Sequence, residues 1–355
     1  MAGEIRKPGT ALVKANETTQ IAWKENETEI AYAIPKLDEA QEEQIRQALE
    51  ARHSPGTRDA YKNAWEHFKH WCVTNNFDSL PAHPKTITLY LTELAKKGKS
   101  ISYIRVVCGA IGYEHKKMWP GNTPPTKAPA VGAVIEGLRK TYGKPPTKKE
   151  PIVDAVLERI VTAFGDLSNA PWEHRLCLTL ILVGRATAMR RSELVNIRMA
   201  DVHEHEDGFV FVIPKSKGDQ TGEGQEVGIN YIENEKLCGA FAFKRWLEYA
   251  KPIDYVFRHE NGKPVTGKDV ASAVKLGIAL LTGGSEEENK KMLLKFSGHS
   301  LRSGHITQGD ISGVPHELLQ RQARHKHIET TQGYMKKTSV AKNNSSMYLG
   351  KPKKT

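Results

Sequence analysis

The chain has 355 residues, of which 39% are hydrophobic and 26% charged, and its formal net charge is +11. This length is typical of two domains, and this composition is typical of a soluble globular protein. The longest apolar run, near residues 176–183, is far shorter than the roughly 20 residues that span a bilayer, and the first residues, MAGEIRKPGT, lack the apolar stretch of a signal peptide. We therefore expect a cytoplasmic protein without a membrane partner.

The basic charge is unevenly distributed. Of the 52 Lys and Arg and the 41 Asp and Glu residues, residues 1–50 hold 6 and 10, which leaves 46 basic and 31 acidic residues for the rest of the chain. Such an excess favours a polyanionic partner, most often nucleic acid. A solvated basic surface gives the same charge, so composition leaves both interpretations open.

The first part of the chain is predicted to be helical. Residues 1–37 show weak periodicity and predict a flexible arm. In SPGTRDAYKNAWEHFKHWC, Ser54 and Pro55 suit an N-cap and first turn, and the aromatic residues behind them recur at helical spacing, which favours a helix core over a base-stacking platform. PKTITLYLTELAKKGKS is a second helix that ends in basic residues and Gly98. We predict a helical domain over residues 38–142.

A linker and a second domain follow. RKTYGKPPTKKEP is rich in Pro and Lys, so residues 143–151 are predicted to be an interdomain linker. Residues 152–337 start with helical segments and continue with two strand-like segments, GFVFVIPKS and EVGINYI, before helices return. LTGGSEEENKKMLLKF is predicted to be a flexible charged loop. The expected fold is mainly α with a small antiparallel β-sheet, in which a helical domain precedes a mixed α/β domain.

Several residue types in the second domain suit phosphodiester chemistry. Guanidinium groups bind phosphate oxygens bidentately, and two of them can stabilise the added negative charge of a pentacoordinate phosphorane. A Tyr phenol, with an ordinary pKa of about 10, needs a base and a positive field before it attacks phosphorus. A Lys can protonate the leaving 5′ oxygen. The candidates are Arg190, Arg191, Lys215, Lys217, His299, Arg302, His325 and Tyr334. Each residue alone is more often a surface or packing residue, so their order and spacing carry the hypothesis.

Metal sites are weakly indicated. His203 with His205, and His325 with His327, are alternate histidines, but neither pair has Cys ligands or a second spaced pair, and the first pair is predicted to lie in a helix-to-strand turn. We expect neither a metal nor another cofactor. The cysteines contain no CxxC motif and are expected to be reduced and buried: Cys72, Cys108, Cys177 and Cys238.

Three segments, in order, resemble the boxes of the tyrosine recombinases, the family of phage integrases, Xer proteins and Cre-like enzymes. TAMRRSELVNIRMADV resembles the first box, in which an Arg is followed by an apolar residue, a small residue, Glu and an apolar residue. SGHSLRSGHIT resembles the His-x-x-Arg box. RHKHIETTQGYMK resembles the last box, in which His or Trp precedes the nucleophilic Tyr by nine residues. The likeness covers roughly residues 151–337, and residues 38–142 are compatible in pattern with the family's core-binding domain.

The resemblance implies two phosphate-binding arginines. Arg190 would be the first, oriented by Glu193, and Arg302 would be the second. Arg190 fits the first box better than Arg191, because Glu193 and Leu194 then fall where the box has them. Arg191 stands at a position that is usually apolar in the family.

The resemblance also implies the groups that move protons. Lys217 would be the general acid on a β-turn, with Lys215 as the alternative. His299 would be the base or proton shuttle, and His325 would donate to the phosphate. Tyr334 would attack, leaving a 3′-phosphotyrosine and a free 5′ hydroxyl. Four basic residues in or beside the linker are further candidates for contact with the DNA backbone: Arg139, Lys140, Lys148 and Lys149.

As a member of this family, the protein would be a site-specific recombinase that clamps double-stranded DNA between two domains. It would be a monomer in solution and a homotetramer on two sites, would form a Holliday junction without metal or ATP, and would lie on the nucleoid in a prokaryote. The basic tail, residues 338–355, would dock on a neighbouring protomer. Two alternatives stay open, a type IB topoisomerase-like enzyme and an inactive sequence-specific DNA-binding protein. The Cre-like spacing of 32 residues from Arg302 to Tyr334 favours the recombinase.

Overall fold

The structure is a computed structural model, and it describes residues 38–119, 121–145, 147–214, 224–283 and 285–334. It divides into two compact units, Met1–Pro146 and Thr147–Thr355, and each unit has a hydrophobic core of its own. The division falls within the segment for which a linker is predicted. The predicted N-terminal arm and the basic tail lie outside the described residues, and the domain limits given above remain predictions.

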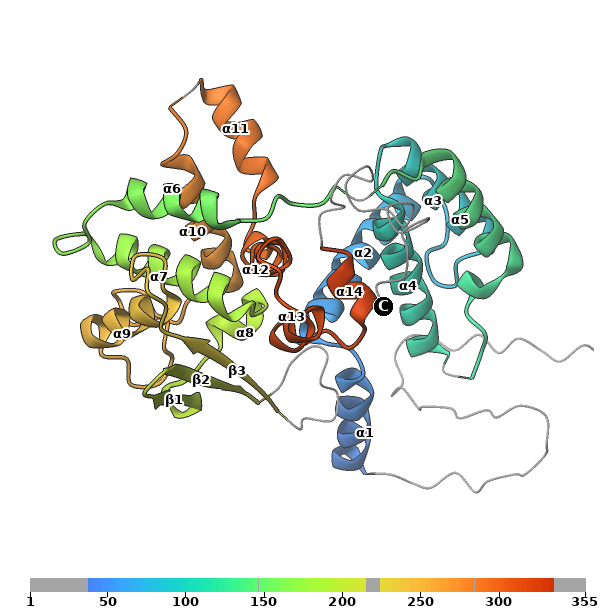
Figure 1. Cartoon of the computed structure of the whole chain (residues 1–355). Helices are drawn as coiled ribbons and strands as arrows, with labels where there is room; N and C mark the ends of the chain where they lie inside the picture. Colours follow the sequence, from blue (N-terminus) through green and yellow to red (C-terminus); the bar gives the residue numbers. More distant parts are fainter. Residues whose placement is uncertain (1–37, 120, 146, 215–223, 284, 335–355) are drawn as a thin grey trace, which may run out of the picture. The chain divides into compact units, whose positions relative to one another are not determined.

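The first unit is helical in its described part (Figure 1). Its α-helices are α1 (Glu39–Ala51), α2 (Pro55–Thr74), α3 (Pro84–Lys96), α4 (Ile101–Met118) and α5 (Pro129–Tyr142), with a 3-10 turn at Pro125–Lys127 before α5. The start of α2 is as predicted, because the Ser54 hydroxyl accepts a hydrogen bond from the Thr57 amide and Pro55 occupies the first turn. The end of α3 is also as predicted, with Gly98 in the left-handed region at φ 77°.

The aromatic stripe of α2 forms the core of this unit. Trp65, Phe68 and Trp71 are at most 9% exposed, and Phe68 and Trp71 both contact the ring of Tyr90 on α3. The indole N–H of Trp71 donates to Glu93 at 3.0 Å, so the polar end of this ring has a partner at the edge of the core. The stripe is therefore a packing surface, as its helical spacing predicts.

The second unit is a helical body with one small sheet. Its elements are α6 (Asp154–Phe164), α7 (Trp172–Thr187), α8 (Arg191–Val195), a 3-10 turn at Met199–Asp201, β1 (Val202–His205), β2 (Gly208–Ile213), β3 (Gln225–Asn230), α9 (Gly239–Ala250), α10 (Gly267–Ala279), α11 (Glu286–Lys295), α12 (His299–Ile311), α13 (His316–Ala323) and α14 (Ile328–Gln332). Helix α7 contacts α9, α10 and α12. It is buried along most of its length, which explains why its sequence is apolar on nearly every side.

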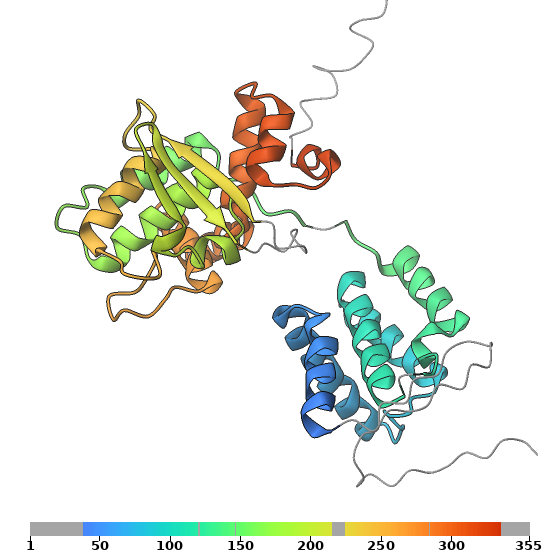
Figure 2. The same cartoon turned by 90° about the horizontal axis from the view of Figure 1, so that it is seen from below.

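The sheet is antiparallel, in the order β1-β2-β3. Val202 of β1 pairs with Phe211 of β2, which pairs with Val227 of β3. Phe209 and Phe211 alternate with less buried residues and pack edge-to-face against Phe243 of α9. Figure 2 shows the sheet lying against the helices of this unit. The mainly α fold with a small antiparallel sheet is thus confirmed.

Two sequence predictions about local structure are wrong. His203 and His205 lie in a strand, β1, rather than in a helix-to-strand turn. The segment predicted to be a flexible charged loop contains a helix, α11, although no residue of that helix is buried. Ser285 and Glu288 form a capping box at its start, and Lys291 pairs with Glu287 one turn back at 3.1 Å. Local capping and helix-forming charged residues outweigh the lack of an apolar face there.

Two further findings concern the described residues alone. No helix among them is long and apolar enough to cross a membrane. They also contain no group of three or more His, Cys, Asp or Glu side chains placed to hold a metal ion. The four cysteines carry free thiols, and Cys72, Cys177 and Cys238 are buried.

Candidate active site

The site begins where α7 ends. Ala188 follows the last turn of α7 in the left-handed conformation, with φ 52°, and turns the chain so that Arg190 becomes the N-cap of α8. Glu193, at the third position of α8, accepts from the Arg190 backbone N–H at 2.8 Å and from its guanidinium Nη1 at 2.6 Å. The Arg-x-x-Glu spacing of the first box thus lets the Glu193 side chain form one half of a capping box, on the Arg190 backbone N–H, and an ion pair with the Arg190 guanidinium.

Arg191 is placed differently from Arg190. Its side chain is exposed, and its Nη1 reaches the carbonyl of Gly267 at 3.4 Å. Its aliphatic part lies against Gly298, where an added Cβ would meet the Arg191 Cδ at 2.4 Å. The long stem thus covers the position before α12 much as an apolar side chain would. The geometry favours Arg190 as the residue that faces the site.

Arg302 joins two helix ends from within the core. It lies on α12, is 2% exposed, donates from Nη1 to the Ala188 carbonyl at 2.6 Å, and donates from Nη2 to the carbonyl of Ala323. Ala188 precedes Arg190 closely, and Ala323 ends α13. Burial, then the neighbouring guanidiniums of Arg190 and Arg324, lower the pKa of Arg302 to about 10, which still leaves it charged at neutral pH.

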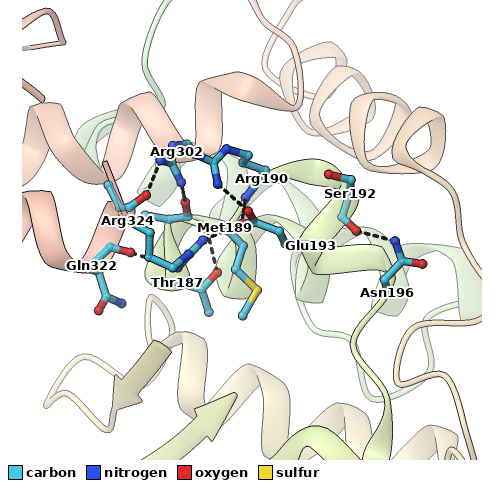
Figure 3. Close-up of polar contacts among 11 residues, drawn as sticks. Thr187, Met189, Arg190, Ser192, Glu193, Asn196, Arg302, Gln322 and Arg324 are labelled. Carbon is cyan, nitrogen blue, oxygen red and sulfur yellow. Dashed lines mark hydrogen bonds and ion pairs between the residues drawn. The ribbon is translucent and has the colours of Figure 1, made fainter. Parts of the chain in front are cut away.

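Arg324 is a third arginine at this place, and it received no role in the sequence analysis. Its Nη2 lies 2.5 Å from Oε2 of Glu193, and its side chain is 3% exposed. Figure 3 shows the guanidiniums of Arg190 and Arg324 on the Glu193 carboxylate, and the guanidinium of Arg302 nearby on two main-chain carbonyls. The residue stands at the start of the last box, so its position was available from the sequence, but nothing in its spacing indicated that it faces Glu193, 131 residues away.

Tyr334 lies between two histidines. Its Oη is 2.9 Å from Nε2 of His299, at the start of α12. Its ring is stacked on that of His325, with 5.6 Å between centroids and 11° between planes. The hydroxyl of Thr307, also on α12, donates to the Tyr334 carbonyl at 3.1 Å. Helix α12 therefore holds both the backbone and the phenol of Tyr334.

Both histidines are held in the neutral form. Burial, and then the charges of Arg302 and Arg190, lower the pKa of His325 to about 4. Burial and the charges of Arg302, Arg191 and Arg190 also lower the pKa of His299. A neutral imidazole at 2.9 Å from a phenol can accept its proton, whereas an imidazolium cannot. Burial and the neighbouring arginines thus keep His299 neutral, so that its Nε2 can accept a proton from Tyr334.

The other basic residues predicted from the sequence include four in or beside the linker, and none of the described ones forms a hydrogen bond or ion pair with a side chain of this cluster. Lys215 and Lys217 lie outside the described residues. Arg139 and Lys140 are on α5 in the other unit, where Arg139 pairs with Glu136 at 3.6 Å. Lys148 donates to the carbonyl of Gly333, directly before Tyr334, at 2.5 Å. Lys149 donates to the carbonyl of Leu294.

Comparisons with known proteins show the family to which the chain belongs. Residues 153–340 match the family model described as phage integrase family. The chain is 30% identical over 309 residues to an integrase/recombinase XerD homolog of Selenomonas ruminantium, a match that covers 84% of this chain and 87% of that protein.

Solved structures share the fold at low sequence identity. A Tn1549 transposon integrase in complex with circular intermediate DNA is 16% identical, with a TM-score of 0.60, over 86% of this chain and 97% of that one. A lambda integrase dimer bound to a COC′ core site is 13% identical, with a TM-score of 0.55, over 84% and 94%. The family match and the curated relative together show that the chain belongs to the phage integrase family and is a tyrosine site-specific recombinase.

Proposed function

We propose that Tyr334 is the nucleophile that cleaves one DNA strand. Its phenol proton passes to Nε2 of His299, its Oη bonds to phosphorus, and the bond from phosphorus to the 5′ oxygen breaks. The product is a 3′-phosphotyrosine and a free 5′ hydroxyl, whose proton comes from Lys217, with Lys215 as the alternative donor. The observation that carries this proposal is the 2.9 Å contact between Tyr334 and His299, within the electrostatic reach of the Arg302 and Arg190 guanidiniums.

The negative charge of the phosphorane is stabilised by Arg190, Arg302 and His325. Arg302 uses two N–H groups on main-chain carbonyls, and a guanidinium has five, so three remain for phosphate oxygens. Nδ1 of His325 lies 2.8 Å from the Thr331 hydroxyl. We propose the tautomer in which Nδ1 accepts a hydrogen bond from the Thr331 hydroxyl, because its Nε2–H can then donate to the phosphate.

The same chemistry run in reverse joins strands. The 5′ hydroxyl of a second duplex attacks the phosphotyrosine, so the energy of the phosphodiester is conserved, and the proposed cycle needs neither ATP nor a metal. Exchange of one pair of strands gives a Holliday junction, and exchange of the second pair resolves it. Because Tyr334 lies against His299 and His325 of its own chain, each protomer of a tetramer on two sites is proposed to cleave with its own tyrosine.

The rest of the chain is proposed to serve binding and assembly. The helical domain, residues 38–142, and the catalytic domain, residues 152–337, hold the duplex between them, with the basic residues near the linker on its phosphates. The tail, residues 338–355, docks on a neighbouring protomer and couples the sites of a tetramer that forms from monomers on DNA. A nucleoid location in a prokaryotic cell follows from this partner.

The test starts with DNA that the protein selects from a random pool. A nicked version of the selected site, from which the fragment beyond the nick is lost, traps the cleaved state. We expect wild type and Tyr249→Phe to form a covalent adduct on the 3′ phosphate, and Tyr334→Phe to bind the DNA without an adduct. Tyr249 is an exposed tyrosine on α9 and serves as the matched control. An adduct from Tyr334→Phe would refute the assignment of the nucleophile.

A substrate with two sites then distinguishes recombination from relaxation. Exchanged products and a four-way junction trapped part-way through the reaction are expected. Relaxation of supercoils without exchange would instead support the topoisomerase-like alternative. Binding without an adduct from any variant would support the inactive DNA-binding alternative.

A further inference from the structure

We infer that Arg324 is a positioning residue for cleavage, and that it neutralises Glu193 so that the positive charge of Arg190 stays available to the scissile phosphate. This inference rests on the proposed function, because it assigns a partner to the arginine that binds the phosphate. It goes beyond that function in naming a third cation that touches neither the nucleophile nor, on this account, the DNA.

The contacts of Glu193 divide between two arginines. Oε1 accepts from the Arg190 guanidinium at 2.6 Å. Oε2 accepts from the Arg190 backbone N–H at 2.8 Å and from Nη2 of Arg324 at 2.5 Å. The side chains of Glu193 and Arg324 are 2% and 3% exposed, whereas that of Arg190 is 28% exposed. Arg324 therefore occupies the enclosed side of the carboxylate and leaves Arg190 on the open side.

The backbone of Arg324 is held in an unusual conformation. Its φ of 55° is in the left-handed region, where a residue with a Cβ is strained. Its Nη1 donates to the Gln322 carbonyl at 3.1 Å, but its Nε is a buried group without a hydrogen-bond partner among the described residues. A residue that keeps a strained backbone and an unsatisfied N–H needs a compensating contact, and the ion pair with Glu193 supplies it.

Three consecutive residues here each contact another part of the site. The carbonyl of Ala323 accepts from Arg302, the side chain of Arg324 pairs with Glu193, and the ring of His325 lies on Tyr334. The left-handed turn at residue 324 ends α13 and lets its neighbours face different partners. The side chain of Arg324 thus reaches the site through Glu193, whereas its backbone sets the directions of Ala323 and His325.

The charges explain what Arg324 contributes. Without it, the Glu193 carboxylate would be balanced by Arg190 alone, and the pair would present almost no net charge to a phosphate. With it, the three groups carry one net positive charge, and Arg302 adds a second. Burial opposes ionisation of Glu193, but Arg324 and the hydrogen bonds from Arg190 more than offset this and lower the pKa of its carboxyl, so the carboxylate is charged and needs neutralising.

The test compares two substitutions that change the backbone alike. Arg324→Gly relieves the left-handed strain and removes one positive charge. Lys251→Gly does the same at the exposed C-terminus of α9, where Lys251 has φ 45°. In single-turnover cleavage of the nicked site at saturating protein, we expect Lys251→Gly to match wild type. We expect Arg324→Gly to be about 10- to 100-fold slower, with affinity for the site changed less than about threefold.

A second substitution separates neutralisation from simple support of the fold. In the Arg324→Gly background, Glu193→Gln removes the charge that Arg324 balances, so we expect cleavage to recover by about fivefold or more. In the wild-type background, the same change should slow cleavage, because Gln holds Arg190 less firmly. A structural role alone predicts that both changes weaken the enzyme, and so a double variant no faster than Arg324→Gly would overturn the inference.

Two more variants keep the test decisive if Arg324→Gly does not fold. Arg324→Lys keeps the charge, and Arg324→Met keeps length without charge. Cleavage at least about tenfold faster by the Lys variant supports the inference, and equal rates refute it. If wild type and Arg324→Gly cleave at equal rates, this inference is refuted and the proposed function stands. If wild type forms no covalent adduct, the proposed function is refuted, and this inference with it.

Discussion

Arg302→Lys tests whether Arg302 both stabilises the fold around the site and contributes to cleavage. The guanidinium of Arg302 is held by two carbonyls on different helices, those of Ala188 and Ala323, and is 2% exposed. A Lys has a single, compact ammonium on a stem that ends short of the guanidinium nitrogens, so it can keep at most one of these hydrogen bonds. The other carbonyl is then buried without this donor.

The magnitude follows from that lost bond. A hydrogen bond to a charged group contributes about 1.5–3 kcal/mol, and a buried carbonyl left without a partner costs about 1–3 kcal/mol. Because both estimates describe the same lost bond, they are not added, and we expect the free energy of unfolding to fall by about 1.5–3 kcal/mol. A domain with the usual stability of about 5–15 kcal/mol then stays folded at 25 °C. The cleavage rate should also fall, by about 100-fold or more, because Lys cannot bind a phosphate bidentately.

The assay combines urea unfolding with single-turnover cleavage of the nicked site. Arg245→Lys is the control, because Arg245 forms an exposed pair with Glu235 at 3.1 Å and should change stability by less than about 0.5 kcal/mol. A loss of stability with a normal cleavage rate would make Arg302 a structural residue only. Unchanged stability and an unchanged rate would refute the reasoning altogether.

Two further predictions concern stability. Gly304→Ala should destabilise the second unit by about 2–4 kcal/mol, because a Cβ would lie 2.2 Å from the backbone oxygen of Ile152, which cannot easily move. At Gly137 in α5 a Cβ would meet nothing within 4 Å, so Gly137→Ala should stabilise the first unit by up to about 1 kcal/mol. Thermal unfolding of each variant measures both effects. The pKa of His325, at about 4, lies below its ordinary value of 6.5, so the unfolded chain binds the proton first. Stability should therefore be constant above about pH 7 and fall as the pH drops from 6.5 towards 4, by about 3 kcal/mol at most from this residue. His325→Gln should lack that part of the loss in urea titrations, and curves of the same shape for both proteins would contradict the shift.

The sequence predicts those parts of the fold that local chemistry decides. The Ser54 cap, the end of α3 at Gly98 and the aromatic stripe of α2 follow from spacing along one helix, and the structure has all of them. The pairing of Arg190 with Glu193, which the family resemblance implied, also lies within one turn. By contrast, α11 has no apolar face, and β1 is only four residues long, so neither gives a periodic pattern strong enough to read.

Contacts between distant segments limit how much of the site can be predicted from the sequence. The 2.9 Å contact from His299 to Tyr334 spans 35 residues, and the one from Arg324 to Glu193 spans 131. The first pair could be anticipated because a resemblance places both residues in one site. The second could not, because it depends on a left-handed backbone at a residue that is not Gly, and no spacing rule indicates where the side chain of such a residue points.

The charged groups of this site are held in place by contacts within the protein. Arg302 is held by two main-chain carbonyls, Glu193 by two arginines, and the backbone of Tyr334 by Thr307. Groups that are already oriented need little reorganisation when negative charge develops on phosphorus, and this is where electrostatic stabilisation contributes most. Affinity for DNA, in contrast, comes mainly from many phosphate contacts along the duplex. Substitutions at these residues should therefore slow cleavage far more than they weaken binding, and a loss of both in equal measure would indicate that the cluster is a DNA-binding surface instead of a catalytic one.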